Sequence, residues 1–222
     1  NVIKLSDITY HSDFEKSAFY LLSSNSPTDF LKIALATNPK INADEFLEIN
    51  GFFSEAIIRI KSDKNFSKIP KKQVKFVFES LQDEFLKLYN INPMLREIFT
   101  NGDFNCITAS VMYAIAFERL SVPYEIKLLP NHAYLIAYPG SINQIVETTN
   151  PLQGSNYSYS SREKYKSVQE LLDYKLISQE EVDEKGVDRV FSDNYLGEET
   201  VNLKQAIGAL YLNAGLAEMG KF

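Results

Sequence analysis

The sequence predicts an α+β fold in which a short antiparallel sheet follows a long helical segment. Apolar residues recur at helical spacing through most of residues 12–100, three extended runs separated by turns lie between residues 124 and 148, and helical spacing returns from residue 167. The chain has 222 residues, of which 45% are hydrophobic and 23% charged, as is typical of globular proteins. A chain of this length can bury a substantial core.

The N-terminal part of the chain predicts several helices. Ser26-Pro27-Thr28-Asp29 is typical of a helix start, because Ser caps, Pro is favoured at the first position and an acid is favoured in the first turn. A second helix is expected to begin at Asn42 and to be interrupted at Asn50-Gly51. The clearest helix runs from Pro70 to about Tyr89, where apolar residues fall at steps of three and four and form one stripe.

The pattern changes after residue 100. Residues 106–120 are apolar almost all round, which predicts a helix buried on most sides. The extended runs that follow are separated by turn residues at spacings that favour an antiparallel meander, and they are Tyr124–Leu129, Ala133–Tyr138 and Gln144–Thr148. Beyond the sheet we expect helices with caps at Ser167 and Ser178, over residues 167–175, 179–194 and 199–218.

These patterns divide the chain into three predicted regions. We expect a helical N-terminal region over residues 1–99, a core that carries the sheet over residues 100–165, and a helical C-terminal region over residues 166–222. The segment 209–222 loosely resembles the opening helix of a tetratricopeptide repeat. This resemblance predicts a repeat-like extension whose helices offer a surface to a protein partner.

Charge and cysteine content exclude several classes of protein. The net charge is −6 and the basic residues are scattered, so the sequence does not predict a nucleic-acid binder. No apolar stretch reaches the ~18 residues that a membrane span needs. The single cysteine fits a cytoplasmic protein, and it fits equally an exported protein whose signal has been removed. We find no calcium loop and predict no metal or cofactor.

The only cysteine, Cys106, is predicted to open the buried helix directly after the turn Asn101-Gly-Asp103. Asn105 can cap this helix and leave Cys106 at its first position. The first turn of a helix exposes free N–H groups and the positive end of the macrodipole, which stabilise a thiolate. The backbone N–H of Cys106 can also form half of an oxyanion hole, with Asn101 as the candidate second donor.

An imidazole and a carboxylate follow on the predicted sheet. His132 begins the second extended run and Glu147 lies at the end of the third, so pairing of the two strands brings these residues nearly opposite each other. A carboxylate beside an imidazole fixes its tautomer and stabilises its cation. Thr149 and Asn150 are alternative orienting groups. A lone cysteine is usually a small buried hydrophobe, but Cys, His and an acid in this order predict a triad for thiol acyl transfer.

These residues resemble the transglutaminase-like superfamily of papain-like cysteine enzymes. The segments that carry the resemblance are Gly102-Asp-Phe-Asn-Cys106, Pro130-Asn-His132-Ala133 and Glu147-Thr148-Thr149. The resemblance implies a Cys-bearing helix packed on an antiparallel sheet, with Cys106 as nucleophile, His132 as base and Glu147 in the acid position. Glu replaces the family's usual Asp, and the Trp found near many such sites is absent because the chain has no Trp.

The leading hypothesis is therefore a thiol-dependent enzyme that acts on amides of a protein or peptide substrate. With water as acceptor it would be a cysteine peptidase or deamidase, and with a lysine amine it would be a transglutaminase-type transferase; we favour hydrolysis. Tyr157 and Tyr159 lie in a polar loop and are candidates to line the substrate groove. The alternative hypothesis is an inactive transglutaminase-like fold that serves as a protein-binding scaffold. Acyl transfer from coenzyme A would need a phosphate-binding loop, which we do not find.

Overall fold

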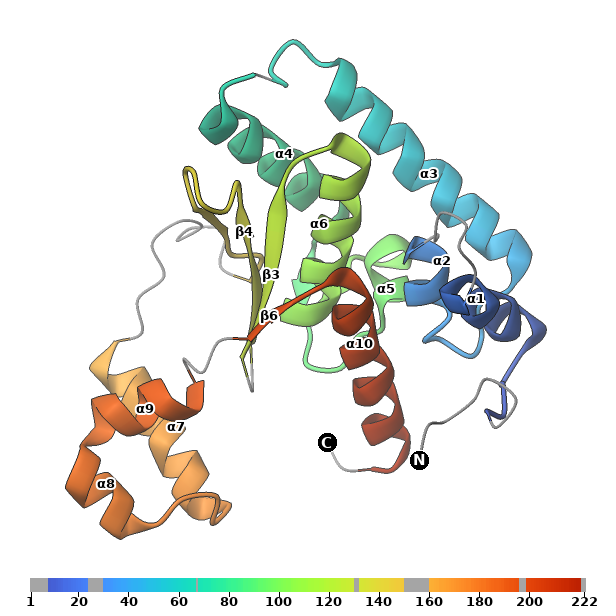
Figure 1. Ribbon diagram of the computed structural model, residues 1–222. Helices are drawn as coiled ribbons and strands as arrows, with labels where there is room; N and C mark the ends of the chain where they lie inside the picture. The colour runs from blue at the N-terminus through green and yellow to red at the C-terminus, as the bar shows by residue number, and fades with distance from the viewer. Residues whose placement is uncertain are drawn as a thin grey trace.

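The protein is built from both helices and strands, as the sequence predicts (Figure 1). The computed structural model describes residues 8–23, 30–66, 68–129, 132–149, 160–195 and 199–220. In chain order the elements are α1 (Asp13–Ser23), α2 (Phe30–Leu35), α3 (Ala43–Ser62), α4 (Pro70–Phe85), β1 (Leu88–Tyr89), α5 (Leu95–Thr100), β2 (Asp103–Phe104), α6 (Cys106–Leu120), β3 (Tyr124–Leu129), β4 (His132–Ala137), β5 (Gln144–Val146), α7 (Ser161–Asp173), α8 (Gln179–Lys185), α9 (Val187–Tyr195), β6 (Glu199–Val201) and α10 (Leu203–Glu218). None of the described helices is long and apolar enough to cross a membrane.

The predicted antiparallel meander is confirmed, and the main sheet has the strand order β5-β4-β3-β6. Its register pairs Ile126 with Leu135, and Leu135 with Val146. These side chains are buried because alternate residues of each strand face helix α6. The sequence placed the start of a helix at residue 199, which is wrong: residues 199–201 form β6, which adds to the edge of β3.

Helix α6 lies at the centre of the core, and its prediction as a buried helix is confirmed. It contacts the sheet on one side and α2, α3, α5 and α10 on the others (Figure 1). Only Cys106, Glu118 and Arg119 within α6 are not buried. The helix ends at Ser121, whose φ of 57° gives the left-handed cap that turns the chain into β3.

Two predictions for the N-terminal helices need correction. Helix α3 runs through Asn50-Gly51 without a break, because a continuous stripe of apolar side chains holds it against the core and a side chain at Gly51 would meet only open space. The helix predicted to reach Tyr89 ends at Phe85, since residues 88–89 turn into β1 and pair in parallel with β2. The helix start predicted at Ser26 lies outside the described residues.

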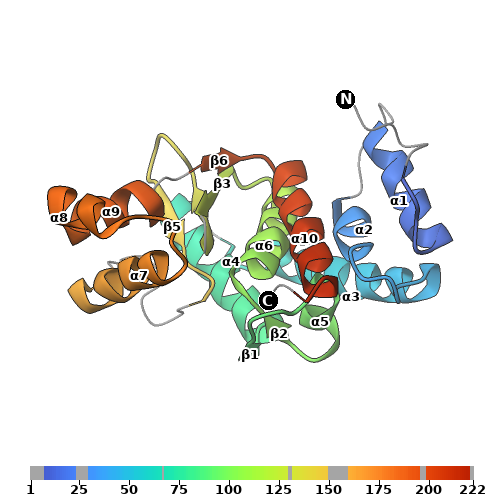
Figure 2. The ribbon, with the colours of Figure 1, turned by 90° about the horizontal axis from the view of Figure 1, so that it is seen from below.

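Helices α7, α8 and α9 form a small unit between β5 and β6 in the chain, with its own core of Val168, Val182, Val190 and Phe191. The views in Figures 1 and 2 both show it to one side of the main body. Ser178 caps α8 as predicted, but α7 starts at residue 161 with Ser160 as its cap, so Ser167 lies within the helix. The helix predicted over residues 179–194 is divided at Gly186, whose φ is +77°.

Candidate active site

The turn before α6 depends on a glycine. Gly102 has a φ of +83°, and a Cβ there would lie 2.4 Å from Cγ of Lys87. The Gly102 carbonyl accepts hydrogen bonds from the backbone N–H groups of Lys87 at 2.9 Å and Leu88 at 3.2 Å. Gly102 therefore allows β1 to approach β2 closely, and this approach places the residues after β1 beside the start of α6.

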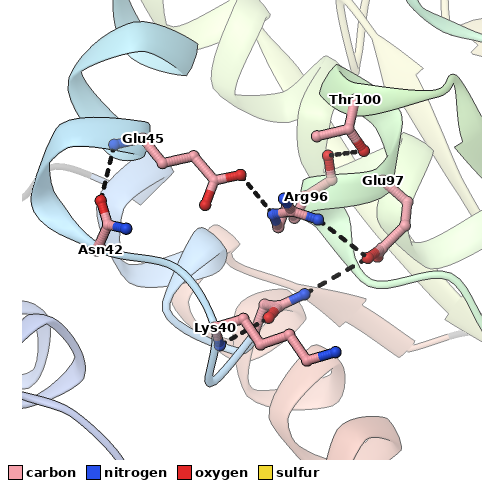
Figure 3. Close-up of polar contacts among 7 residues, drawn as sticks. Lys40, Asn42, Glu45, Arg96, Glu97 and Thr100 are labelled. Atoms are coloured by element: carbon pink, nitrogen blue, oxygen red, sulfur yellow. Dashed lines mark hydrogen bonds and ion pairs between the residues drawn. The ribbon is translucent and has the colours of Figure 1, made fainter.

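Polar contacts tie the same turn to the helical body (Figure 3). Nε of Arg96 on α5 lies 2.6 Å from Oε1 of Glu45 on α3, and the Asn38 carboxamide donates to Glu97 at 3.4 Å. The backbone carbonyl of Glu97 in turn accepts from the N–H of Gly102 at 2.9 Å. These contacts join α5 to Glu45 and Asn38 on one side and to Gly102 on the other. The loop that leads to Cys106 is therefore held in place.

Cys106 is the first residue of α6, as predicted from Asn105. The Asn105 side chain accepts from the N–H of Thr108 at 3.0 Å, while the Thr108 hydroxyl accepts from the N–H of Asn105 at 2.9 Å. The Asn105 amide nitrogen donates to the carbonyl of Ile91 at 3.1 Å. Asn105 therefore orients the start of the helix and the loop beside it, and the thiol of Cys106 remains partly exposed.

His132 and Glu147 meet as the sequence predicts. Nε2 of His132 lies 2.7 Å from Oε2 of Glu147, whose exposed fraction is only 3%. The other carboxylate oxygen accepts from the backbone N–H of Thr149 at 3.0 Å and from its hydroxyl at 2.7 Å. Thr149 thus orients the acid, and the acid orients the imidazole.

The contacts of His132 change its protonation. Burial by itself lowers the pKa of the imidazole, but hydrogen bonds to Cys106 and Glu147, together with the negative charges of these residues, raise it to about 9. Burial likewise acts to raise the pKa of Glu147, but the bonds from His132 and Thr149 outweigh it and the pKa of this carboxyl is lowered. At neutral pH the site therefore holds a carboxylate and an imidazolium next to the sulfur of Cys106.

Cys106 and His132 lie in a cleft of about 530 Å³. One wall is the segment from Tyr89 to Leu95, and the opposite wall is the C-terminal half of α10. Partial burial and the charges of Cys106 and Glu147 raise the pKa of Tyr89. Tyr89 and α10 are site elements that the sequence reasoning missed, because the chain around Tyr89 continues the helical spacing of α4 and α10 is distant in sequence.

The structure does not bring every candidate residue to the cleft. The carboxamide of Asn101 accepts from the backbone N–H of Asp103 at 3.0 Å, and Asn101 does not line the cleft in the part of the chain that is described. Tyr157 and Tyr159, the candidates for the substrate groove, lie outside the described residues, as do Pro130 and Asn131 next to His132.

No group of three or more His, Cys, Asp or Glu side chains is placed to hold a metal ion among the described residues. Comparisons of the chain with protein-family models, with curated proteins and with solved structures found no match. The functional interpretation therefore depends on the residues of the cleft and their geometry.

Proposed function

We propose that the protein is a thiol-dependent enzyme that acts on amides through Cys106, His132 and Glu147. The observation that carries this proposal is the imidazole of His132, which lies 2.7 Å from the carboxylate of Glu147 and lines the same open cleft as Cys106. The arrangement is the one expected of a transglutaminase-like core, in which a helix that begins with Cys packs on an antiparallel sheet that supplies His and then an acid.

The reaction follows from the roles of the three residues. The imidazole of His132 holds the proton of the Cys106–His132 pair, the sulfur attacks the carbonyl carbon of a carboxamide or peptide, and a C–S bond forms as the C=O π bond opens to an oxyanion. The oxyanion that develops faces the free backbone N–H groups at the start of α6. His132 then donates its proton to the leaving amine, which leaves a thioester on Cys106. Water activated by His132 then hydrolyses this thioester. We favour this hydrolysis, which makes the protein a peptidase or deamidase, over transfer to an amine.

Glu147 contributes by position and charge. Its carboxylate is fixed by Thr149 and faces His132, so it holds the imidazole in one orientation and stabilises the cation that exists during the reaction. The longer side chain of Glu, compared with the Asp of the family pattern, is accommodated because the strand β5 has ended at Val146 before Glu147.

The second candidate function is a non-catalytic protein-binding scaffold on the same fold. The Glu at position 147 and the absence of Trp favour it, since both depart from the family pattern. A scaffold has no need of an accessible thiol, whereas the Cys106 side chain is partly exposed and lines the cleft.

Alkylation of Cys106 by iodoacetamide distinguishes the two functions. Because Cys106 is the only cysteine, mass spectrometry of the intact protein reads its reaction directly. In the wild type we expect fast alkylation that persists below pH 7, and in His132→Ala we expect the slower profile of an ordinary thiol that ionises near ~8.5. The variant His11→Ala, which removes the other histidine, is the control. Identical profiles for the wild type and His132→Ala would exclude the enzyme and favour the scaffold.

A further inference from the structure

The cleft around Cys106 differs from the rest of the surface in charge. Charged residues make up 23% of the chain, yet no Lys, Arg, Asp or Glu is among the described residues that line this cleft. Glu147, the nearest carboxylate, is buried behind His132 and is bonded to it. Apart from the catalytic pair, these walls therefore carry no charged side chain that could form an ion pair with a charged group of a substrate.

The rim of the cleft carries large apolar side chains that are exposed to solvent. On one wall Tyr89 and Ile91 have exposed fractions of 53% and 76%, and on the α10 wall Leu212 has an exposed fraction of 62%. Exposed apolar side chains are ordinary when they are scattered, but a group of them around a concave site marks a binding surface. The two walls thus present apolar groups to the same occupant.

Helix α10 leaves space within the cleft. It packs against α6 (Figures 1 and 2). Its residues at positions 210, 214 and 217 share one face of the helix and line the same cleft as Cys106 at the start of α6. Two of these three residues are alanines, so the wall is apolar without filling the volume in front of Cys106. An apolar side chain of a substrate can occupy that volume.

Polar groups on both walls suit a peptide backbone. Asn92 lies on the wall that follows β1, and Asn213 lies on α10. Each carboxamide can donate to a peptide carbonyl and accept from a peptide N–H. An apolar cleft with a few such groups is the usual composition of a site that binds a neutral ligand in a defined orientation.

We propose that the substrate is a polypeptide segment with an apolar, uncharged side chain on the residue whose carbonyl Cys106 attacks, seated between Tyr89–Leu95 and α10. This inference rests on the proposed function and names the substrate class of the same site. Apart from the catalytic pair, the described lining offers a charged side chain no ion pair in exchange for the hydration that it would lose in the cleft, so acidic and basic residues are selected against.

N-acetylated aminoacyl chloromethyl ketones of Leu, Ala, Glu and Lys test this proposal. Cys106 displaces chloride from the methylene carbon, a C–S bond forms, and the rate is read from the mass of the intact protein. Peptide mapping assigns the modification to Cys106. We expect the Leu reagent to react at least tenfold faster than the Ala reagent, because each buried methylene contributes about 0.8 kcal/mol, which is about fourfold. The Glu and Lys reagents should be at least tenfold slower than the Leu reagent.

A matched pair of leucines supplies the variants. Leu212→Lys places a positive charge on the α10 wall, and Leu176→Lys places the same charge on the α7–α9 unit, where Leu176 is exposed to a similar degree, 69% against 62%. We expect Leu212→Lys to reduce the preference for the Leu over the Glu reagent at least tenfold, and Leu176→Lys to leave it unchanged. Both leucines are exposed, so both variants should fold.

The outcomes separate this inference from the function on which it rests. Equal rates with the Leu, Ala and Glu reagents, or an equal effect of the two Lys variants, would overturn the substrate class while leaving the reactive Cys–His pair in place. Failure of every reagent, and of iodoacetamide, to modify Cys106 in the folded protein would overturn the proposed function itself.

Discussion

The protonation of His132 has a measurable effect on stability. The pKa of the imidazole is about 9 in the folded protein, against 6.5 for the group in an unfolded chain. Below pH 6.5 both states hold the proton, so the stabilisation is fully present. Between pH 6.5 and 9 only the folded state holds it, and unfolding releases the proton. The stabilisation is therefore lost as the pH rises through this interval.

The size of the effect follows from the same two values. At about 1.4 kcal/mol for each pH unit, the interval from 6.5 to about 9 corresponds to roughly 3–4 kcal/mol of unfolding free energy. Other groups titrate in the same range, so the wild type is compared with His132→Gln. We expect the wild type to lose about 3–4 kcal/mol more than the variant between pH 6 and pH 9.5.

Urea unfolding followed by far-ultraviolet circular dichroism at several pH values measures this difference. A direct reading comes from the imidazole resonances of His11→Gln, in which His132 is the only histidine left. A midpoint of titration at or below 6.5, or the same pH dependence of stability in the wild type and His132→Gln, would refute the reasoning and remove the support for an imidazolium between Cys106 and Glu147.

Three further predictions concern the residues that hold the site together. Gly102→Ala should lower the unfolding free energy by about 2 kcal/mol or more, because the φ of +83° and the contact with Lys87 both resist a Cβ. Gly208→Ala, in open space within α10, should raise the unfolding free energy by about 0.5–1 kcal/mol. The urea midpoint should therefore be lowest for Gly102→Ala and highest for Gly208→Ala, and any other order would contradict this. Asn105→Ala removes the cap of α6, so it should lower the unfolding free energy by about 1 kcal/mol and slow the alkylation of Cys106. Asn202→Ala removes the equivalent cap of α10 and should lower the unfolding free energy by as much without slowing alkylation. Equal alkylation rates in the two variants would contradict this. The lowered pKa of Glu147 contributes stability above pH 4.5 that is lost as the pH falls through the pKa of the folded state. Thr149→Val removes a hydrogen-bond donor to Glu147, so the midpoint of acid unfolding should move to higher pH. An unchanged midpoint would show that the Thr149 hydroxyl does not support the acid.

The parts of the site that the sequence predicted depend on local signals. An Asn cap followed by a run of apolar residues places Cys106 at the start of α6, and both features lie within a few residues of the cysteine. The approach of His132 to Glu147 follows from the register of one hairpin, which the intervening turn sets. In both cases the interacting groups are close in sequence, so periodicity and turn residues suffice.

The parts that the sequence did not predict depend on contacts between distant segments. Leu88 and Tyr89 continue the apolar spacing of α4, and only the parallel pairing with β2 makes them extended and brings Tyr89 to the cleft. Residues 199–201 form a strand because they pair with the edge of β3. A segment of three residues is too short for an alternation of apolar and polar residues to predict a strand. The wall formed by α10 likewise results from its packing against α6.

The insertion of α7–α9 between β5 and β6 sets the order in which the sheet is completed during synthesis. Strand β3 is finished at Leu129, but its outer neighbour begins only at Glu199. At about 5–20 residues per second, the edge of β3 waits roughly 4–14 s on the ribosome for its partner. An unpaired edge is a template for strands of other chains. The small core of the inserted unit allows it to fold early, so that β6 and then α10 can close the main body before neighbouring nascent chains pair with that edge.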